Sequence, residues 1–152
     1  MDHDDILRRR VLHLMPLSAA GELAPRGVDL QLHTHRHRVS SRQAVFDREI
    51  RENQALLRTL RSSEATHFCY PGGVHRAEFL PWLRGSHIAS ATTCAPDMAS
   101  RHHDRLLLPR YIDTADHTDA EFRAWLTGIA TFLPRRRQAE TVGQFVEEPA
   151  AS

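Results

Sequence analysis

Three histidines fall within five residues of the chain, and their spacing is the first feature that could carry chemistry. His33, His35 and His37 follow residues 28–34, where apolar and polar side chains alternate as in a β-strand. If the strand continues, the three imidazoles share one face. If it ends and the chain turns, His33 and His37 converge instead. Either arrangement presents two imidazoles, which are common ligands of zinc and similar metals, to one ion.

Two histidines are an incomplete catalytic metal site. A catalytic zinc usually takes three protein ligands and keeps one position for water, so a carboxylate or a third histidine is still required. A solvated polar loop is the alternative interpretation of the run HTHRHR, and the residue pattern alone leaves both open.

The elements that must position these histidines alternate between strands and helices. Strand patterns cover residues 28–34, 65–70, 87–93 and 105–112. Helical patterns begin after the capping candidates Ser40 and Ser41, over residues 76–84, and from Asp119. This alternation predicts a parallel sheet with right-handed crossovers, in which chemistry collects at the carboxyl ends of the strands. Polar, glycine and proline residues gather at the predicted strand ends, over residues 33–37, 70–73, 92–96 and 109–110.

Composition limits the class of protein. The chain has 152 residues, 20 cationic side chains (all arginine) and 19 acidic ones, which suits one globular domain and argues against a general nucleic-acid binder. No stretch approaches the roughly 20 apolar residues that span a bilayer. The first residues do not form a convincing signal peptide, so the cytoplasm is the default expectation. Cys69 and Cys94 give no disulfide framework, and we expect them to be buried thiols.

The run His33-Thr34-His35-Arg36-His37 resembles the second motif of polysaccharide deacetylases, carbohydrate esterase family four with the NodB-homology domain. That motif is a histidine, a serine or threonine, two further residues and a histidine. The resemblance implies that His33 and His37 bind a divalent metal ion, with zinc as the first expectation. It also implies that the Thr34 hydroxyl fixes the loop.

Residues 68–73 (FCYPGG) resemble the family's third motif, a strand-end loop that lines the substrate groove. The family often has arginine where this chain has Cys69. The resemblance implies that the Gly72 amide helps to hold the oxyanion. Arg110 ends a predicted strand and could orient the sugar or a carboxylate, or form a structural salt bridge. The oxyanion and substrate loop is thus assigned to Tyr70, Pro71, Gly72 and Arg110.

The resemblance implies an α/β fold, namely a partial, distorted (β/α) barrel of the NodB-homology type that lacks the first strands. Residues 1–13 are then an N-terminal extension, 14–133 the partial deacetylase domain and 134–152 a flexible C-terminal tail. The family's Asp-Asp-Gly motif, which supplies the general base and the third ligand, is not visible. Asp4-Asp5 has no apolar strand before it and no glycine after it, so the base is unknown. Candidates for the general acid are His87, His102 and His103.

The function implied by the resemblance is metal-dependent hydrolysis of N-acetyl groups on a carbohydrate, with this shortened chain inactive by itself as one expectation. Two alternatives stay open. One is a metal-dependent phosphoesterase of the His-x-His type, and the other is a non-catalytic, degenerate glycan-binding module. Missing strands would also expose a sheet edge, which predicts a marginal monomer or self-association through that edge.

Overall fold

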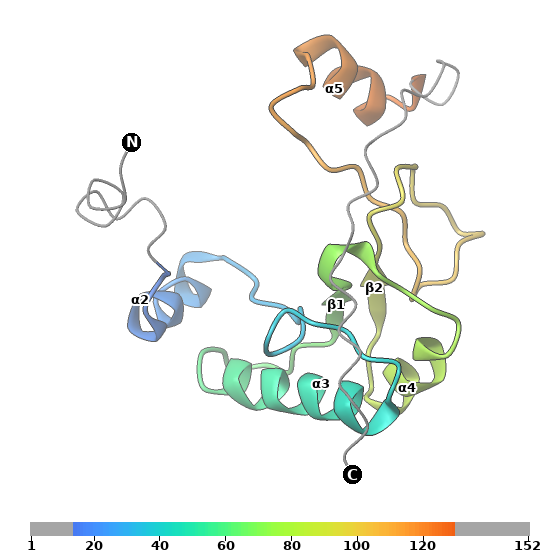
Figure 1. Ribbon diagram of the computed structural model, residues 1–152. Helices are drawn as coiled ribbons and strands as arrows, with labels where there is room; N and C mark the ends of the chain where they lie inside the picture. Colours follow the sequence, from blue (N-terminus) through green and yellow to red (C-terminus); the bar gives the residue numbers. More distant parts are fainter. Residues whose placement is uncertain (1–13, 130–152) are drawn as a thin grey trace, which may run out of the picture.

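The computed structural model of the chain describes residues 14–129 (Figure 1). The elements in chain order are helix α2 Leu17–Gly21, 3-10 helix η1 Ala24–Arg26, helix α3 Gln43–Arg58, strand β1 His67–Cys69, 3-10 helix η2 Pro71–Gly73, helix α4 Phe79–Gly85, strand β2 Ser90–Thr92 and helix α5 Asp119–Leu126. The predicted alternation of strands and helices is therefore confirmed. None of the helices in this range is long and apolar enough to cross a membrane. The expected N-terminal extension and C-terminal tail lie outside the described residues.

The sheet is a parallel pair whose two faces differ in chemistry. In β1 and β2, His67 pairs with Ser90, Phe68 with Ala91, and Cys69 with Thr92. Successive side chains point to opposite faces of a strand, so Phe68 and Ala91 enter the core while their neighbours point to the other face. Parallel bridges at Leu32 and Leu108 add one chain segment on each side of the pair.

The two outer strands are shorter than predicted. The segment 28–34 contributes only the bridge from Leu32 to Phe68, because the Gln31 side chain accepts hydrogen bonds from the amides of Thr66 (3.1 Å) and His67 (3.0 Å) in place of a ladder. The segment 105–112 is reduced to the bridge at Leu108, because the Arg110 amide donates to the Ala95 carbonyl (2.9 Å) and not to the Thr93 carbonyl that a continuing ladder would use. Within residues 14–129 the sheet does not close, so the predicted barrel is not confirmed.

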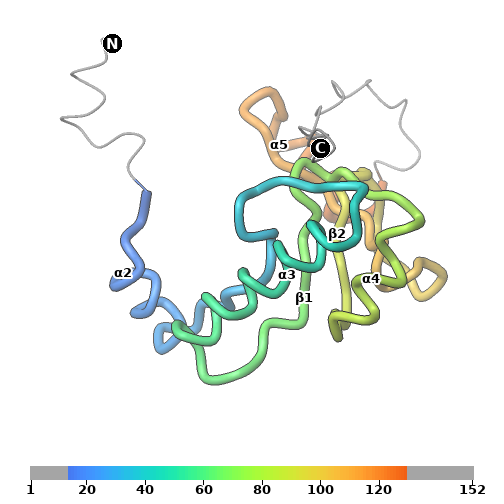
Figure 2. Tube along the Cα trace, turned by 60° about the horizontal axis from the view of Figure 1, so that its bottom comes forward, coloured from blue at the N-terminus to red at the C-terminus, as the bar shows by residue number. Residues whose placement is uncertain are grey.

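Helices α3 and α4 cover one face of the strand pair, and the core lies between these helices and the strands (Figure 1, Figure 2). Phe46 of α3 stacks on Phe79 of α4 with ring centroids 4.9 Å apart, and it also meets the edge of Phe68 at 6.3 Å. The helical spacing of Phe46, Ile50 and Leu57 predicts this face correctly. Helices α2 and α5 project away from the core on different sides (Figure 1).

Helices α3 and α4 begin differently from the prediction, whereas α5 begins at the predicted residue. Arg42, and neither serine, is the N-cap of α3; the Ser40 hydroxyl instead accepts from the Arg42 amide at 3.1 Å. Pro81 falls in the first turn of α4, where its missing amide hydrogen has no intrahelical partner to lose. Helix α5 begins at Asp119 behind a capping box between Thr118 and Glu121.

Candidate functional site

A tight loop after the Leu32 bridge brings two of the three histidines together. Thr34 and His37 adopt left-handed backbone angles, with φ of 57° and 55°, and the chain folds back on itself. As a result the rings of His33 and His37 meet edge to face with centroids 4.9 Å apart, whereas His35 is exposed between them. Of the two geometries that the spacing allowed, the converging pair is the one observed.

Hydrogen bonds fix the orientation of His33. Its amide donates to Oδ1 of Asn53, a buried residue of α3, at 2.9 Å. Its ring Nδ1 lies 2.7 Å from the carbonyl oxygen of Cys69. Because a carbonyl can only accept, Nδ1 must carry the proton, and Nε2 keeps a free lone pair. A histidine whose Nδ1 donates to a backbone carbonyl has the arrangement typical of metal ligands that bind through Nε2.

The Cys69 thiol and the His33 imidazole change each other's pKa. Hydrogen bonding to His33 lowers the pKa of the Cys69 thiol to about 7, against the opposing effect of burial. The same interaction with Cys69 raises the pKa of His33, with a smaller contribution from the bond to the Cys69 carbonyl. Both cysteines are half-buried free thiols, so the expectation that they are buried holds only in part.

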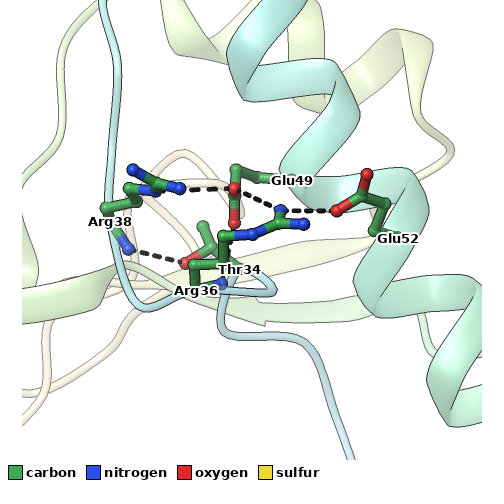
Figure 3. Close-up of polar contacts among 5 residues, drawn as sticks. All are labelled: Thr34, Arg36, Arg38, Glu49 and Glu52. Atoms are coloured by element: carbon green, nitrogen blue, oxygen red, sulfur yellow. Dashed lines mark hydrogen bonds and ion pairs between the residues drawn. The ribbon is translucent and has the colours of Figure 1, made fainter. Parts of the chain in front are cut away.

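The Thr34 hydroxyl accepts from the Arg38 amide at 3.1 Å, across the loop that holds the histidines (Figure 3). Thr34 is itself buried, and a β-branched residue is unfavourable at positive φ. The bond therefore closes a turn that the backbone alone would not favour. This is the loop-fixing role that the motif implies for a threonine at this position.

An open groove of about 440 Å³ runs along the sheet face that the helices leave uncovered. His33, Cys69 and Arg110 line it, together with Gln31, Leu32, His67, Phe68, Ser90 and Thr92. Arg110 is held by its amide, which donates to Ala95 at 2.9 Å, and by its guanidinium, 3.4 Å from the Cys94 sulfur. The structure thus brings Arg110 to the same groove as His33.

The loop after β1 uses two of its backbone amides in hydrogen bonds within the turn. The Gly73 amide donates to the Tyr70 carbonyl at 2.9 Å and the Val74 amide to the Pro71 carbonyl at 3.1 Å. In the described part of the chain no acceptor is found for the Gly72 amide. Gly73 has φ of +72°, and a Cβ there would lie 2.6 Å from Cys94 Cβ, so only glycine fits.

Tyr70 and Pro71 connect this loop to the core. Both are buried, and the Tyr70 hydroxyl donates to the Leu106 carbonyl at 3.0 Å inside the core. Burial raises the pKa of Tyr70. The Tyr70 side chain therefore holds the loop in place and does not face the groove, which differs from the contact role implied by the motif.

The donor set suits a divalent metal but supplies only part of a site. Two imidazoles converge, one with its tautomer set for Nε2 ligation. Within residues 14–129, however, no third histidine, cysteine or carboxylate joins them in a metal-binding group. Asp4-Asp5 lies outside the described residues. The general-acid candidates His87, His102 and His103 are exposed and do not line the groove.

Two polar residues of α3 contact the loop of residues 33–38, called the histidine loop below, and the sequence analysis does not identify them. Glu49 and Asn53 are buried, one helical turn apart, on the face that also carries Phe46, Ile50 and Leu57. A carboxylate and an amide interrupting the apolar face of an amphipathic helix were the available signal, since buried polar groups need partners.

No protein-family model matches the sequence, and neither does any curated protein. Solved structures do share its fold. A polysaccharide deacetylase from Bacillus cereus matches with a TM-score of 0.63 and 16% identity, over 74% of this chain and 36% of that one. IcaB from Ammonifex degensii matches with a TM-score of 0.61 and 19% identity, over 78% and 53%. A Bacillus anthracis protein assigned to the same deacetylase class matches with a TM-score of 0.60 and 16% identity, over 76% and 36%.

These likenesses define the class of fold. Over about three quarters of its length the chain has the fold of polysaccharide deacetylases, as the motifs predict. The chain spans between about a third and a half of the length of the structures that it matches.

Proposed function

We propose that this chain is part of a metal-dependent hydrolase that removes N-acetyl groups from a carbohydrate. The observation that carries the proposal is the His33–His37 pair, directly after the parallel bridge at Leu32 in a deacetylase-type fold, with His33 Nε2 left free by the bond from Nδ1 to Cys69. The groove beside the pair contains hydrogen-bonding groups and one guanidinium, which suits a sugar.

The chemistry divides between the metal and the chain. A divalent ion, with zinc as the first candidate, would polarise the acetyl carbonyl and lower the pKa of water towards about 7. His33 and His37 would hold that ion. The free Gly72 amide donates to the oxygen of the acetyl group as negative charge develops on it, and such a donor contributes roughly 3 kcal/mol. Arg110, which lines the same groove as His33 and Cys69, orients the sugar.

Turnover requires a base and a third ligand that residues 14–129 do not provide. We therefore propose that this chain acts only when a carboxylate from outside this range completes the site. The same observation favours a second candidate, a groove that binds a glycan without turnover. The phosphoesterase alternative gains no support, because the matched structures are deacetylases and no further ligand cluster is present in the described range.

Metal analysis of the purified protein tests the proposal. We expect about one zinc ion per chain after zinc loading, and its loss in the His33→Ala/His37→Ala double variant. His35→Ala is the matched control, since His35 belongs to the same run but takes no part in the ring contact between His33 and His37. Absence of metal from the loaded native chain, or equal loss in the control, would contradict the proposal.

Acetate release from N-acetylated oligosaccharides then separates the two candidates. Release that depends on His33 and His37 supports the hydrolase. Saturable glycan binding without acetate release identifies the non-catalytic groove instead.

A further inference from the structure

Glu49 of α3 reaches the middle of the histidine loop, although its side chain is only 2% exposed (Figure 3). Its Oε2 accepts from the backbone amide of Arg36 at 2.7 Å, and its Oε1 accepts from the Arg36 guanidinium at 2.9 Å. The Arg38 guanidinium lies 3.7 Å from the same Oε1. One buried carboxylate therefore contacts both arginines that flank His37.

The neighbouring Glu52 provides the contrast. It binds the same Arg36 guanidinium at 2.5 Å, but it is 37% exposed and, among the residues that the structure describes, makes no hydrogen bond to the loop backbone. A surface pair of this kind contributes little to stability. A buried carboxylate is expensive unless hydrogen bonds and opposite charges satisfy it, and Glu49 occupies a position where an apolar residue would cost less.

The loop explains what Glu49 contributes. Two residues of the loop, Thr34 and His37, have positive φ, and such conformations persist only where surrounding contacts impose them. Asn53 holds the start of the loop through the His33 amide, and Glu49 holds its middle through the Arg36 amide. Residues i and i+4 share one helix face, so α3 holds the loop at two points, the amide of His33 itself and the amide of Arg36, the residue before His37.

We propose that Glu49 is a positioning residue for the His33–His37 pair. By accepting the Arg36 amide it sets the backbone between the two imidazoles, and so their separation at a metal ion. This inference rests on the proposed metal site, and it adds a residue that touches neither the ion nor the substrate.

The test compares Zn²⁺ affinity across variants of the full chain, measured by calorimetry. Glu49→Gln keeps the shape of the side chain but places an amide nitrogen against Arg36. Glu49→Asp keeps the charge, so that the chain still folds if glutamine is not tolerated, and withdraws the acceptor by one methylene. Both should weaken Zn²⁺ binding by about 10-fold or more, as removal of groups that orient metal ligands commonly does.

Two controls separate positioning from general stability. Glu52→Gln removes the exposed partner of Arg36, and Zn²⁺ affinity should stay within about threefold of native. Ile50→Val destabilises the same helix from the core without touching the loop, and it should also leave the affinity nearly unchanged. If native-like affinity persists in both Glu49 variants, or if Ile50→Val loses as much as they do, the inference is wrong.

A metal-free readout distinguishes failure of this inference from failure of the metal site. Nitrogen-15 spectra of the histidine rings report tautomer and exchange of His33 and His37 without any ion. Shifted or broadened ring signals in the Glu49 variants, with native signals in Glu52→Gln, support positioning even if the native chain binds no Zn²⁺ and the proposed function falls. Unchanged ring signals together with unchanged affinity overturn it.

Discussion

His33 and Cys69 lie at the ends of neighbouring parallel segments and are hydrogen-bonded to each other. The ring Nδ1 of His33 lies 2.7 Å from the main-chain carbonyl oxygen of Cys69. The bond fixes the imidazole tautomer and places the Cys69 thiol in the same groove. Interactions between these two residues, 36 positions apart, therefore affect both which ring nitrogen is open to a metal and how readily the thiol ionises.

The Cys69 thiol should react with iodoacetamide with a midpoint near pH 7. His33 lowers its pKa to about 7 from the usual value near 9.0, so the reactive thiolate forms at lower pH in the folded chain. At pH 7 about half of the thiol is ionised, compared with about one per cent for an unperturbed group. Rates against pH, with peptide mapping to separate Cys69 from Cys94, measure this. His33→Ala should move the midpoint upward, and a native midpoint above about 8.5 would contradict the assignment.

Asn53→Ala should lower the free energy of unfolding by about 1–3 kcal/mol, because the His33 amide would lose its acceptor in a buried setting. The adjacent Gln54→Ala is the control. Gln54 also bonds a backbone group, the Ser86 carbonyl, but at 3.3 Å and in a half-buried position, so its loss should stay below about 1 kcal/mol. Urea unfolding of both variants gives the comparison, and equal losses would count against a special role for the His33 amide.

The sequence predicts the order of strands and helices well because each carries a local periodic signal. Residues 65–70 and 87–93 contain β1 and β2, and the spacing from Phe46 marks the buried face of α3. The outer strand at 28–34 is shorter than predicted because a side chain intervenes: Gln31 accepts from the amides of Thr66 and His67, which periodicity does not report. Barrel closure was likewise expected from resemblance and depends on strands that residues 14–129 do not contain.

The site was predictable where a motif names the residue and less so where support comes from elsewhere in the fold. The convergence of His33 and His37 was one of two geometries that their spacing allows, and the positive φ of Thr34 and His37 decides between them. Tyr70 belongs to the right loop, but its direction into the core follows from the hydrogen bond to Leu106 and not from its place in the motif. Glu49 and Asn53 could not be assigned to the loop without knowing where α3 lies.

Gly73→Ala should destabilise the chain by about 2–4 kcal/mol. Its φ of +72° disfavours any side chain, and the new Cβ would meet Cys94 Cβ at 2.6 Å and the Cys94 backbone nitrogen at 3.0 Å. Gly85→Ala is the matched control, because a Cβ there meets nothing within 4 Å, and it should leave stability unchanged or raise it by up to about 1 kcal/mol. Thermal unfolding of both proteins checks the contrast. A native-like Gly73→Ala would mean that the loop moves freely away from Cys94.

Phe46→Leu should lower the free energy of unfolding by about 1–2 kcal/mol, from lost aromatic pairing and a partly filled cavity. Phe46 is buried, and its ring centroid lies 4.9 Å from that of Phe79, 5.5 Å from that of Trp82 and 6.3 Å from that of Phe68. It therefore joins α3 to α4 and to β1. Phe122→Leu is the control, because Phe122 is 38% exposed on α5, and the change there should stay within about 0.5 kcal/mol.

Urea unfolding followed by far-ultraviolet and near-ultraviolet dichroism measures both phenylalanine variants. Because Phe46 joins α3 to α4 and β1, a core defect there should shift the far-ultraviolet and near-ultraviolet transitions together. Loss of the near-ultraviolet signal alone would show that the helix forms without docking on the strands. An equal loss of stability in Phe122→Leu would contradict the placement of the core between α3, α4 and the strand pair.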